Sequence, residues 1–457
     1  MTDLARLKNA LAQTPLFAGK SWKISAGAWN FSADELEELR AIGTAALAFY
    51  RALERLYLAS AEGKSLLRNR KLFAPWVAEI LDRGKPSRLV AHARARALRG
   101  TFPPVIRPDL LITENGFALT ELDSVPGGIG LTAFLENLYL GASEIPQLFL
   151  SALGGRRVVA AVSDEAAEYR PEFEWLATQL PAGAFSVCHP DELEIRADVP
   201  EGGVFFAGEK VDVVWRFFEL FDFENLRNAS ALADAAERGL VSVGPPMRAF
   251  QEEKMSLALF RHPALAEFWR ESLGEENFRV FEKIVPASWI VEPVENLPAT
   301  ATLLAPKPLR DWCELASFPR RERNLVLKAS GFSPEAWGAR SVSVGADVSA
   351  EEWARAVARA IESARRGSLY VLQEFRKPSR VEHEFFSPNG KRVSADGRAR
   401  ICPYYFVENG VAQLGGALAT ICPADKKIIH GMSSAVLAPC AFSRDSADLL
   451  REKNHDF

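Results

Sequence analysis

Residues 112–132 read ITENGFALTELDSVPGGIGLT, and this stretch carries the strongest indication of the fold. Two strand-like runs lie on either side of Asn115-Gly116, and such a pair between alternating runs predicts a β-hairpin. The second run ends in Glu121 and Asp123, whose spacing of two residues places both carboxylates on the same face of a strand. A glycine-rich loop follows directly, with Gly127, Gly128 and Gly130.

Two carboxylates on one strand face repel each other, so the pair needs either a cation or a strong hydrogen-bond shell. Mg²⁺ is held in proteins by one or two carboxylates together with substrate phosphates. The pair therefore favours a magnesium site, and a hydrogen-bonded pair is the alternative. The glycines that follow would let a charged group come close to the backbone.

The bulk composition restricts the class of protein. At 457 residues the chain is long enough for two or three domains, and its 48% apolar and 25% charged residues are typical of a soluble globular protein. A net charge of −4 argues against nucleic-acid binding, which needs clustered excess Lys and Arg. The basic run Arg83–Arg99 is the local exception; it is interpreted as a solvated helix face, with contact to an anionic ligand as the alternative.

Cysteine usage and apolar runs predict a cytoplasmic protein that does not bind membranes. The five cysteines contain no CxxC pair and are too scattered for a disulfide framework or a zinc site. Cys402 and Cys422 each precede a proline in a β-like run, so we expect buried strand thiols. The N-terminus lacks the apolar region of a signal peptide, and no apolar run approaches the ~20 residues of a membrane span.

Composition and periodicity divide the chain into four expected regions: a helical N-terminal region at 1–100, the hairpin and glycine loop at 101–154, a small α/β domain at 155–240, and a nucleotide-binding region at 241–457. Apolar residues recur at steps of three and four over 33–62, which predicts one long helix. Helical character is also expected over 66–98, with a break near Gly84-Lys85-Pro86.

In the third region, strand, helix and strand patterns follow one another at 156–163, 168–180 and 185–195, and this alternation predicts a parallel sheet. The run 204–218 adds a hairpin-like pair. In the fourth region, Ser349 and Glu352 form a capping box ahead of a helix. A further hairpin is expected at Asn409-Gly410.

Lys328 ends the strand-like run NLVLKAS (324–330), directly before a loop of small residues. An ammonium group beside such a loop suits a nucleotide phosphate, because phosphates bind point positive charge together with free backbone N–H donors. The alternative is a lysine that reaches solvent from a sheet edge. A later apolar strand, 368–375, ends in Gln373-Glu374-Phe375 and could face adenine and ribose, or it is a buried strand leaving the core.

The order of these motifs resembles that of the circularly permuted ATP-grasp enzymes, chiefly eukaryotic-type glutathione synthetase and glutathionylspermidine synthetase. The resemblance begins with Arg107-Pro108-Asp109 before the hairpin and Glu121-Leu122-Asp123-Ser124 at its end. It continues with Arg216 on a strand, Lys254 at the start of a helix, Lys328 before the loop 331–338, and Gln373-Glu374 at the end of a strand. It covers roughly residues 105–435, about seven-tenths of the chain.

The resemblance implies an α/β (α+β) protein with a circularly permuted ATP-grasp fold, an inserted small parallel α/β substrate domain and a helical N-terminal region. It implies an ATP- and Mg²⁺-dependent ligase that joins a small-molecule carboxylate to an amine through an acyl phosphate. Members of this family often form homodimers, and helices 33–62 and 66–98 could supply such an interface or cover the sheet.

The resemblance also implies roles for individual residues. Arg107 would neutralise the transferring phosphoryl group, and Arg216 is a second candidate catalytic residue. Glu121 and Asp123 would hold Mg²⁺, with Glu335 as a third ligand. The residues expected to bind nucleotide are Lys254, Lys328, Ser330, Gly331, Gly338, Gln373, Glu374 and Phe375.

The chain departs from the family at three places. Asp123 stands where the family usually has Asn, and the loop SGFSPEAWGARS replaces a run of glycines. The segment CPADKKIIHGMSSAV (422–436) replaces an arginine- and glycine-rich substrate loop, so the carboxylate and amine are left unidentified. A non-catalytic nucleotide-binding regulator and a small-molecule kinase are the alternative functions.

Overall fold

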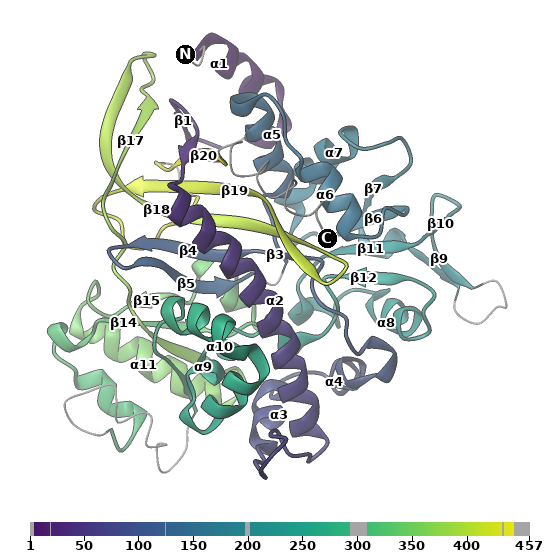
Figure 1. The fold of residues 1–457 in the computed structure, drawn as a ribbon, viewed down its shortest axis with the longest axis vertical. Coiled ribbons are helices and arrows are strands. Elements are labelled where there is room, and N and C mark those ends of the chain that lie inside the picture. The colour runs from purple at the N-terminus through teal and green to yellow at the C-terminus, as the bar shows by residue number, and fades with distance from the viewer. Residues whose placement is uncertain are drawn as a thin grey trace, which may run out of the picture.

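A computed structural model describes residues 4–18, 20–123, 125–196, 202–292, 309–431 and 434–442, without the side chains of 337–339. The fold is a mixed α/β arrangement in which helices cover four sheets (Figure 1). The long helix α2 crosses one face of the largest sheet in Figure 1. In this view the sheet that contains β14 and β15 lies on one side of α2, and the sheet that contains β6, β11 and β12 lies on the other. Within the described ranges, no helix has the length and apolar character needed to cross a membrane.

The largest sheet has the strand order β17-β1-β20-β19-β18-β4-β5, with β2 paired to β20 and β3 to β18. Its strands are β1 Lys23–Ser25, β2 Trp29–Asn30, β3 Val105–Ile106, β4 Pro108–Thr113, β5 Gly116–Leu122, β17 Val381–Phe386, β18 Arg392–Glu408, β19 Val411–Pro423 and β20 Val436–Ala441. Both expected hairpins are confirmed: β4 pairs with β5, and β18 with β19. Asn409 and Gly410 both have positive φ, which is the requirement of a type I′ turn.

Helix α2 (Ala33–Ala61) confirms the predicted long helix. Ser32 caps it in a capping box with Glu35, and its apolar stripe packs against α10 (Ala266–Ile284) and the largest sheet. The expected helical character over 66–98 is only partly correct. Residues 66–74 are irregular, and helix α3 (Pro75–Asp82) begins at a proline, which suits the first turn of a helix.

The basic run is not a bare solvated face. Arg88, on helix α4 (Ser87–Arg94), forms ion pairs with Asp234 and Glu237 of helix α8 (Ala229–Glu237). Lys85, just before this helix, is buried against Glu253. The chain's own carboxylates therefore neutralise these cations.

The predicted parallel sheet is confirmed, with the order β12-β11-β6-β7 and all neighbours parallel. Its strands are β6 Val158–Val162, β7 Phe185–Cys188, β11 Val213–Phe217 and β12 Ser242–Gly244. Helix α7 (Arg170–Thr178) contributes to the core on one face and α8 to the core on the other. The run 204–218 divides: β9 (Gly203–Phe206) and β10 (Glu209–Val211) form the hairpin beside β8 (Glu194–Arg196), whereas β11 joins the parallel sheet.

The fourth sheet is antiparallel, in the order β13-β16-β14-β15, with strands β13 Ser288–Val291, β14 Leu325–Ala329, β15 Ser343–Val344 and β16 Tyr370–Glu374. Helix α11 (Ala350–Arg365) starts at the predicted capping box of Ser349 and Glu352 and buries Trp353 on this sheet. Helix α9 (Met255–Arg261) packs with β13 and β16. This sheet lies beside the β4–β5 end of the largest sheet (Figure 1).

The remaining α-helices are α1 Leu4–Gln13, α5 Ile129–Leu140 and α6 Ile145–Ala152. Short 3-10 helices lie at Pro15–Phe17, Arg96–Leu98, Ala167–Tyr169, Pro190–Glu192, Leu220–Asp222, Ala249–Glu252, Pro263–Leu265, Trp312–Ser317, Arg320–Glu322 and Pro334–Ala339. Cys402 and Cys422 are buried on β18 and β19, as expected for strand thiols.

Candidate active site

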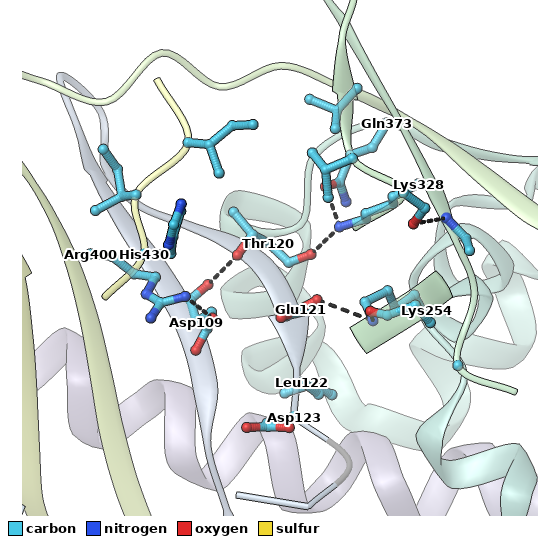
Figure 2. Close-up of a pocket in the computed structure, with 18 of the residues that line it drawn as sticks. Asp109, Thr120, Glu121, Leu122, Asp123, Lys254, Lys328, Gln373, Arg400 and His430 are labelled. Carbon is cyan, nitrogen blue, oxygen red and sulfur yellow. Dashed lines mark hydrogen bonds and ion pairs between the residues drawn. The ribbon is translucent and has the colours of Figure 1, made fainter. Parts of the chain in front are cut away.

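A cavity of about 370 Å³ opens where the β4–β5 hairpin meets the β14–β16 sheet and the start of α9. Several of the residues singled out from the sequence line it: Arg107, Glu121, Asp123, Lys254, Lys328, Gly331, Gln373, Glu374 and Phe375. Figure 2 shows the two lysines on one side of the hairpin strand and Arg400 with His430 on the other. The tertiary fold therefore brings together residues that are far apart in the sequence.

Lys328 lies on β14, between β15 and β16, and only 5% of it is exposed. The alternative of a lysine reaching solvent from a sheet edge is therefore wrong. Its Nζ donates to the carbonyl oxygen of Thr120 at 2.6 Å and to Oε1 of Gln373 at 3.1 Å. These contacts aim the ammonium group at the hairpin.

Lys254 caps the start of α9 and approaches the same cavity from a different element. Its Nζ donates to the carbonyl oxygen of Ala336 at 3.1 Å and lies 3.4 Å from Oε2 of Glu121. Burial lowers the pKa of Lys254, but the carboxylate of Glu121 raises it above the ordinary value. Lys254 is consequently a fixed positive charge beside the hairpin.

Glu121 is likewise held in its charged form by its surroundings. Burial raises the pKa of this carboxyl, but Lys254, Lys328 and two guanidinium groups outweigh burial and lower the pKa to about 2. Conversely, burial lowers the pKa of Lys328 to about 8, although Glu121 opposes the shift. The site thus holds an ionised carboxylate between two ammonium groups.

Asp123 follows the end of β5 and forms an ion pair with Arg107. Burial raises the pKa of Asp123 to about 7, against the effect of Arg107, and the carboxylates of Asp109 and Glu121 add to the rise. An additional cation near Asp123 would stabilise its ionised form and lower its pKa. Ser124, the next residue of the motif, lies outside the described residues.

Arg400 is a site residue that we did not identify from the sequence. Asp109 is buried between Arg107, with N–O 3.4 Å, and Arg400, with N–O 2.7 Å, and it accepts a hydrogen bond from Sγ of Cys402 at 3.2 Å. Nε of both arginines is buried without a partner among the described residues. The sequence signal that could have identified Arg400 is a charged residue within the largely apolar strand-like run RARICPYYF (398–406).

Two further acids, Glu219 and Glu252, line the cavity beside Glu121 and Asp123. Burial raises the pKa of Glu252 to about 8, against Arg216, and Glu219 contributes to the rise. Carboxylate oxygens are the ligands that Mg²⁺ prefers, and their crowding here fits a divalent cation. Nevertheless, within the described ranges no group of three or more His, Cys, Asp or Glu side chains is arranged to hold a metal.

Arg216 does not line the cavity. It is fully buried at the end of β11, forms an ion pair with Glu252, and donates to the backbone carbonyls of Pro245 at 3.1 Å and Phe218 at 2.5 Å. These partners use its donors inside the protein. The position corrects the expectation that it meets the reacting groups; it instead orients Glu252.

Glu335 is also placed away from the expected metal site. Its Oε2 accepts a hydrogen bond from the hydroxyl of Tyr370 at 2.6 Å, and it does not line the cavity. The local reason is the 3-10 helix at Pro334–Ala339, which also contains Gly338. Ser330 is buried behind the cavity wall, where its hydroxyl donates to Glu253.

The glycines after the hairpin contact the protein itself. A Cβ on Gly127 would overlap Tyr169, and one on Gly130 would overlap the backbone of Glu172. Glu172 accepts the N–H of Gly128 at 2.8 Å and thereby caps α5. The loop therefore needs glycine for packing, which corrects the expectation that it leaves space for a charged ligand.

Residues 427–431 line the wall of the cavity opposite the lysines. Lys427 forms an ion pair with Asp347, which joins this segment to the chain just after β15. Burial and the charge of Arg400 lower the pKa of His430. A neutral imidazole and a guanidinium group therefore face the same end of the cavity, while residues 432–433 lie outside the described residues.

No protein-family model matches the sequence, and no curated protein matches it. The three-dimensional structure is nevertheless similar in fold to a glutathione synthetase-like protein. A glutathione synthetase-like effector from Globodera pallida, solved in its apo form, aligns with a TM-score of 0.53 over 95% of this chain and 96% of its own, at 12% identity. A candidate γ-glutamylcysteine synthetase from Methylobacillus flagellatus KT aligns with a TM-score of 0.42 over 78% of this chain and 84% of its own, at 14% identity.

Proposed function

We propose that the protein is an ATP- and Mg²⁺-dependent carboxylate–amine ligase of the circularly permuted ATP-grasp type. The observation that carries this proposal is the convergence of Lys254, Lys328, Glu121 and Asp123 on one cavity. Two ammonium groups on separate elements suit a polyphosphate, and two acids suit the divalent ion that accompanies it. The similarity of the fold to a glutathione synthetase-like protein supports the same class of chemistry.

Lys254 and Lys328 would bind the α- and β-phosphates of ATP, and the Gln373–Phe375 segment would lie along adenine and ribose. The backbone N–H groups of Glu374 and Phe375 already donate to the carbonyls of Ala287 and Asn324. Because these two N–H groups already have partners, we assign the carboxylate of Glu374 to the ribose hydroxyls. A lysine beside a phosphate acts as a point charge, so its distance matters more than its orientation.

Glu121 and Asp123 would hold Mg²⁺. The oxygen donors fit this ion, and Glu121 is ionised at every working pH because its pKa is about 2. When bound, the ion would neutralise charge on the β- and γ-phosphates. Glu219 and Glu252, which line the same wall of the cavity, would supply further oxygen atoms near the ion.

In the first chemical step, an oxygen of the substrate carboxylate attacks the γ-phosphorus, and ADP leaves. The amine then attacks the acyl carbon, inorganic phosphate leaves, and the nitrogen loses a proton. The first step brings two anions together, and in the second step the leaving phosphate carries negative charge, so catalysis is mainly positioning and charge neutralisation. Arg107 and Arg400 carry buried Nε–H donors without partners among the described residues, and we assign them to the carboxylate and its acyl phosphate.

The loop 331–343 would cover the triphosphate and exclude water, which otherwise hydrolyses an acyl phosphate. Lys254 already donates to the carbonyl of Ala336 in this loop. Binding of a phosphate would give the ammonium group a stronger partner and release that carbonyl. The loop is therefore coupled to occupancy of the nucleotide site.

The test is ADP release with Mg-ATP across a panel of amino acids, γ-glutamyl dipeptides and polyamines, supplied singly and in pairs. A ligase releases ADP only when a carboxylate and an amine are both present. Release with a single acceptor would establish a kinase instead. Nucleotide binding without ADP release under any condition would favour a non-catalytic regulator.

A further inference from the structure

A buried ion pair lies behind the nucleotide site, outside the cavity. Lys85 belongs to the turn between α3 and α4, and its Nζ is 2.5 Å from Oε1 of Glu253. Only 2% and 1% of the two side chains are exposed. Removing two charges from water costs several kcal/mol per ion, so such a pair persists only where further hydrogen bonds satisfy it.

Those further hydrogen bonds go to the loop after β14. The second oxygen of Glu253, Oε2, accepts from the hydroxyl of Ser330 and from the backbone N–H of Gly331 at 2.8 Å. The hydroxyl of Ser330 in turn accepts the N–H of Met255 at 3.1 Å. One carboxylate therefore connects the start of α9 to the loop that follows β14.

This connection joins the two chain segments that carry the lysines facing the cavity. Glu253 directly precedes Lys254, and Ser330 follows Lys328 by two residues. The contact between the segments is tight, because a Cβ on Gly331 would overlap the backbone of Glu252. The distance between the two ammonium groups thus depends on the bonds that Glu253 makes.

The third part of the connection comes from the N-terminal helical region. Lys85 supplies the positive charge that balances Glu253, and its Nζ also lies 5.4 Å from the ring centroid of Phe332, in the same loop. Lys85 is 168 residues from its partner in the sequence, so the helical region supports the wall of the nucleotide site from outside the cavity.

We infer that Lys85 and Glu253 are positioning residues that fix the spacing of Lys254 and Lys328 for the phosphates of a nucleotide. This inference rests on the proposed function, in which the two lysines bind ATP. Neither residue touches the cavity. They act by holding Ser330 and Gly331 against the start of α9.

The test measures two quantities for each variant: the affinity for ATP by calorimetry and the thermal midpoint of unfolding. Lys85→Met leaves Glu253 buried without its cation, so both quantities should fall. The double variant Lys85→Met/Glu253→Met removes both charges and should recover much of the stability. Its affinity for ATP should nevertheless stay ~10-fold or more below that of the wild type, because the bonds to Ser330 and Gly331 are lost.

The matched control is Arg83→Met. Arg83 lies two residues from Lys85, and its ion pair with Glu292 has a similar length, 2.6 Å, but does not contact Glu253. We expect its affinity for ATP to equal that of the wild type. If Lys85→Met does not fold, Ser330→Ala removes one of the bonds without exposing a charge, and several-fold weaker binding is expected.

The outcomes separate this inference from the proposed function. Recovery of both stability and affinity in the double variant would show that the pair has only a structural role. Wild-type affinity in Lys85→Met or in Ser330→Ala would also overturn the inference, while leaving the ligase proposal intact. Failure of the wild-type protein to bind ATP would overturn both.

Discussion

Nζ of Lys328 lies 2.6 Å from the carbonyl oxygen of Thr120, so an ammonium group of the β14–β16 sheet is held by the backbone of the largest sheet. The neighbouring residue, Glu121, directs its carboxylate toward Lys254 (Figure 2). Two sheets and one helix thus meet at a cluster of alternating charges. In the proposed function, the two ammonium groups exchange these partners for the phosphates of ATP.

The first prediction concerns Lys328. Lys328→Met keeps the volume of the side chain but removes the charge, and affinity for ATP should fall ~10- to 100-fold, the scale of one lost hydrogen bond to a charged group. Calorimetry with the metal-free nucleotide checks this. Lys391→Met, at an exposed position, is the control. Equal affinity in the two variants would show that Lys328 has a structural role only.

The second prediction concerns the carboxylate of Glu121. Glu121→Gln should reduce ADP release ~100-fold or more at saturating Mg-ATP, because the amide is a poor magnesium ligand. Raising the pH should not rescue the variant, since the amide does not ionise. Glu114→Gln, exposed at the tip of the same hairpin, should behave like the wild type. Wild-type turnover of Glu121→Gln would contradict the metal assignment.

Arg400 provides a third prediction. Arg400→Met removes a guanidinium group on the side of the hairpin away from the lysines (Figure 2). We expect kcat/KM for the carboxylate to fall ~100-fold, the scale of one lost transition-state donor, while affinity for ATP stays within a few-fold of wild type. Arg392→Met, at the exposed start of the same strand, is the control. A parallel loss of ATP affinity would place Arg400 at the nucleotide instead.

A fourth prediction concerns stability and pH. Burial raises the pKa of Glu136 from 4.5 to about 7, although a hydrogen bond from Ser143 opposes the rise. The folded state therefore holds this proton more tightly than the unfolded state, and stability falls as the pH rises from about 4.5 through about 7. Glu136→Gln lacks this titration. Its free energy of unfolding relative to that of the wild type should therefore rise by ~2 kcal/mol between pH 5 and pH 8.

Chemical denaturation at the two pH values measures this difference. Glu37→Gln, at an exposed position on α2, should show no such change between them. An advantage of Glu136→Gln that is constant with pH would show that Glu136 is ionised throughout.

The fifth prediction tests the packing of α2 on α10. Phe49 is fully buried, and its ring stacks on Trp269 at 5.2 Å and on Phe281 at 4.9 Å between centroids. Phe49→Ala should reduce the free energy of unfolding by ~3–5 kcal/mol, through lost burial and the cavity left behind. Phe73→Ala, at a side chain that is 53% exposed, should change it by less than ~0.5 kcal/mol. A similar small effect at Phe49 would contradict the packing.

Local signals predicted much of the secondary structure correctly. The Asn-Gly pairs predicted both hairpins, because type I′ and related turns depend on two residues only. The capping box at Ser349 predicted the start of α11, and the periodicity of 33–62 predicted α2, because both signals depend on residues that are close together in the chain. The expectation over 66–98 was wrong at 66–74, where neither a cap nor a packed apolar stripe supports a helix.

Prediction of the site was less complete. Glu121 and Lys328 lie near the ends of their strands, a position that the short-range pattern predicted, and both line the cavity. Arg216 fits the same description, but a carboxylate 36 residues further along binds it inside the protein. Glu335 accepts a hydrogen bond from the hydroxyl of Tyr370 and does not line the cavity. The expected homodimer and the boundaries of the four regions stay predictions.

By itself, the sequence determined the positions of the hairpins, the long helix and the parallel αβ unit, because these depend on residues close together in the chain. Only the tertiary structure decided how the charges pair: Asp109 with Arg400 across 291 residues, and Lys85 with Glu253. The physical reason is that the free energy of a buried charge depends on its partner. Packing alone determines which partner is within reach.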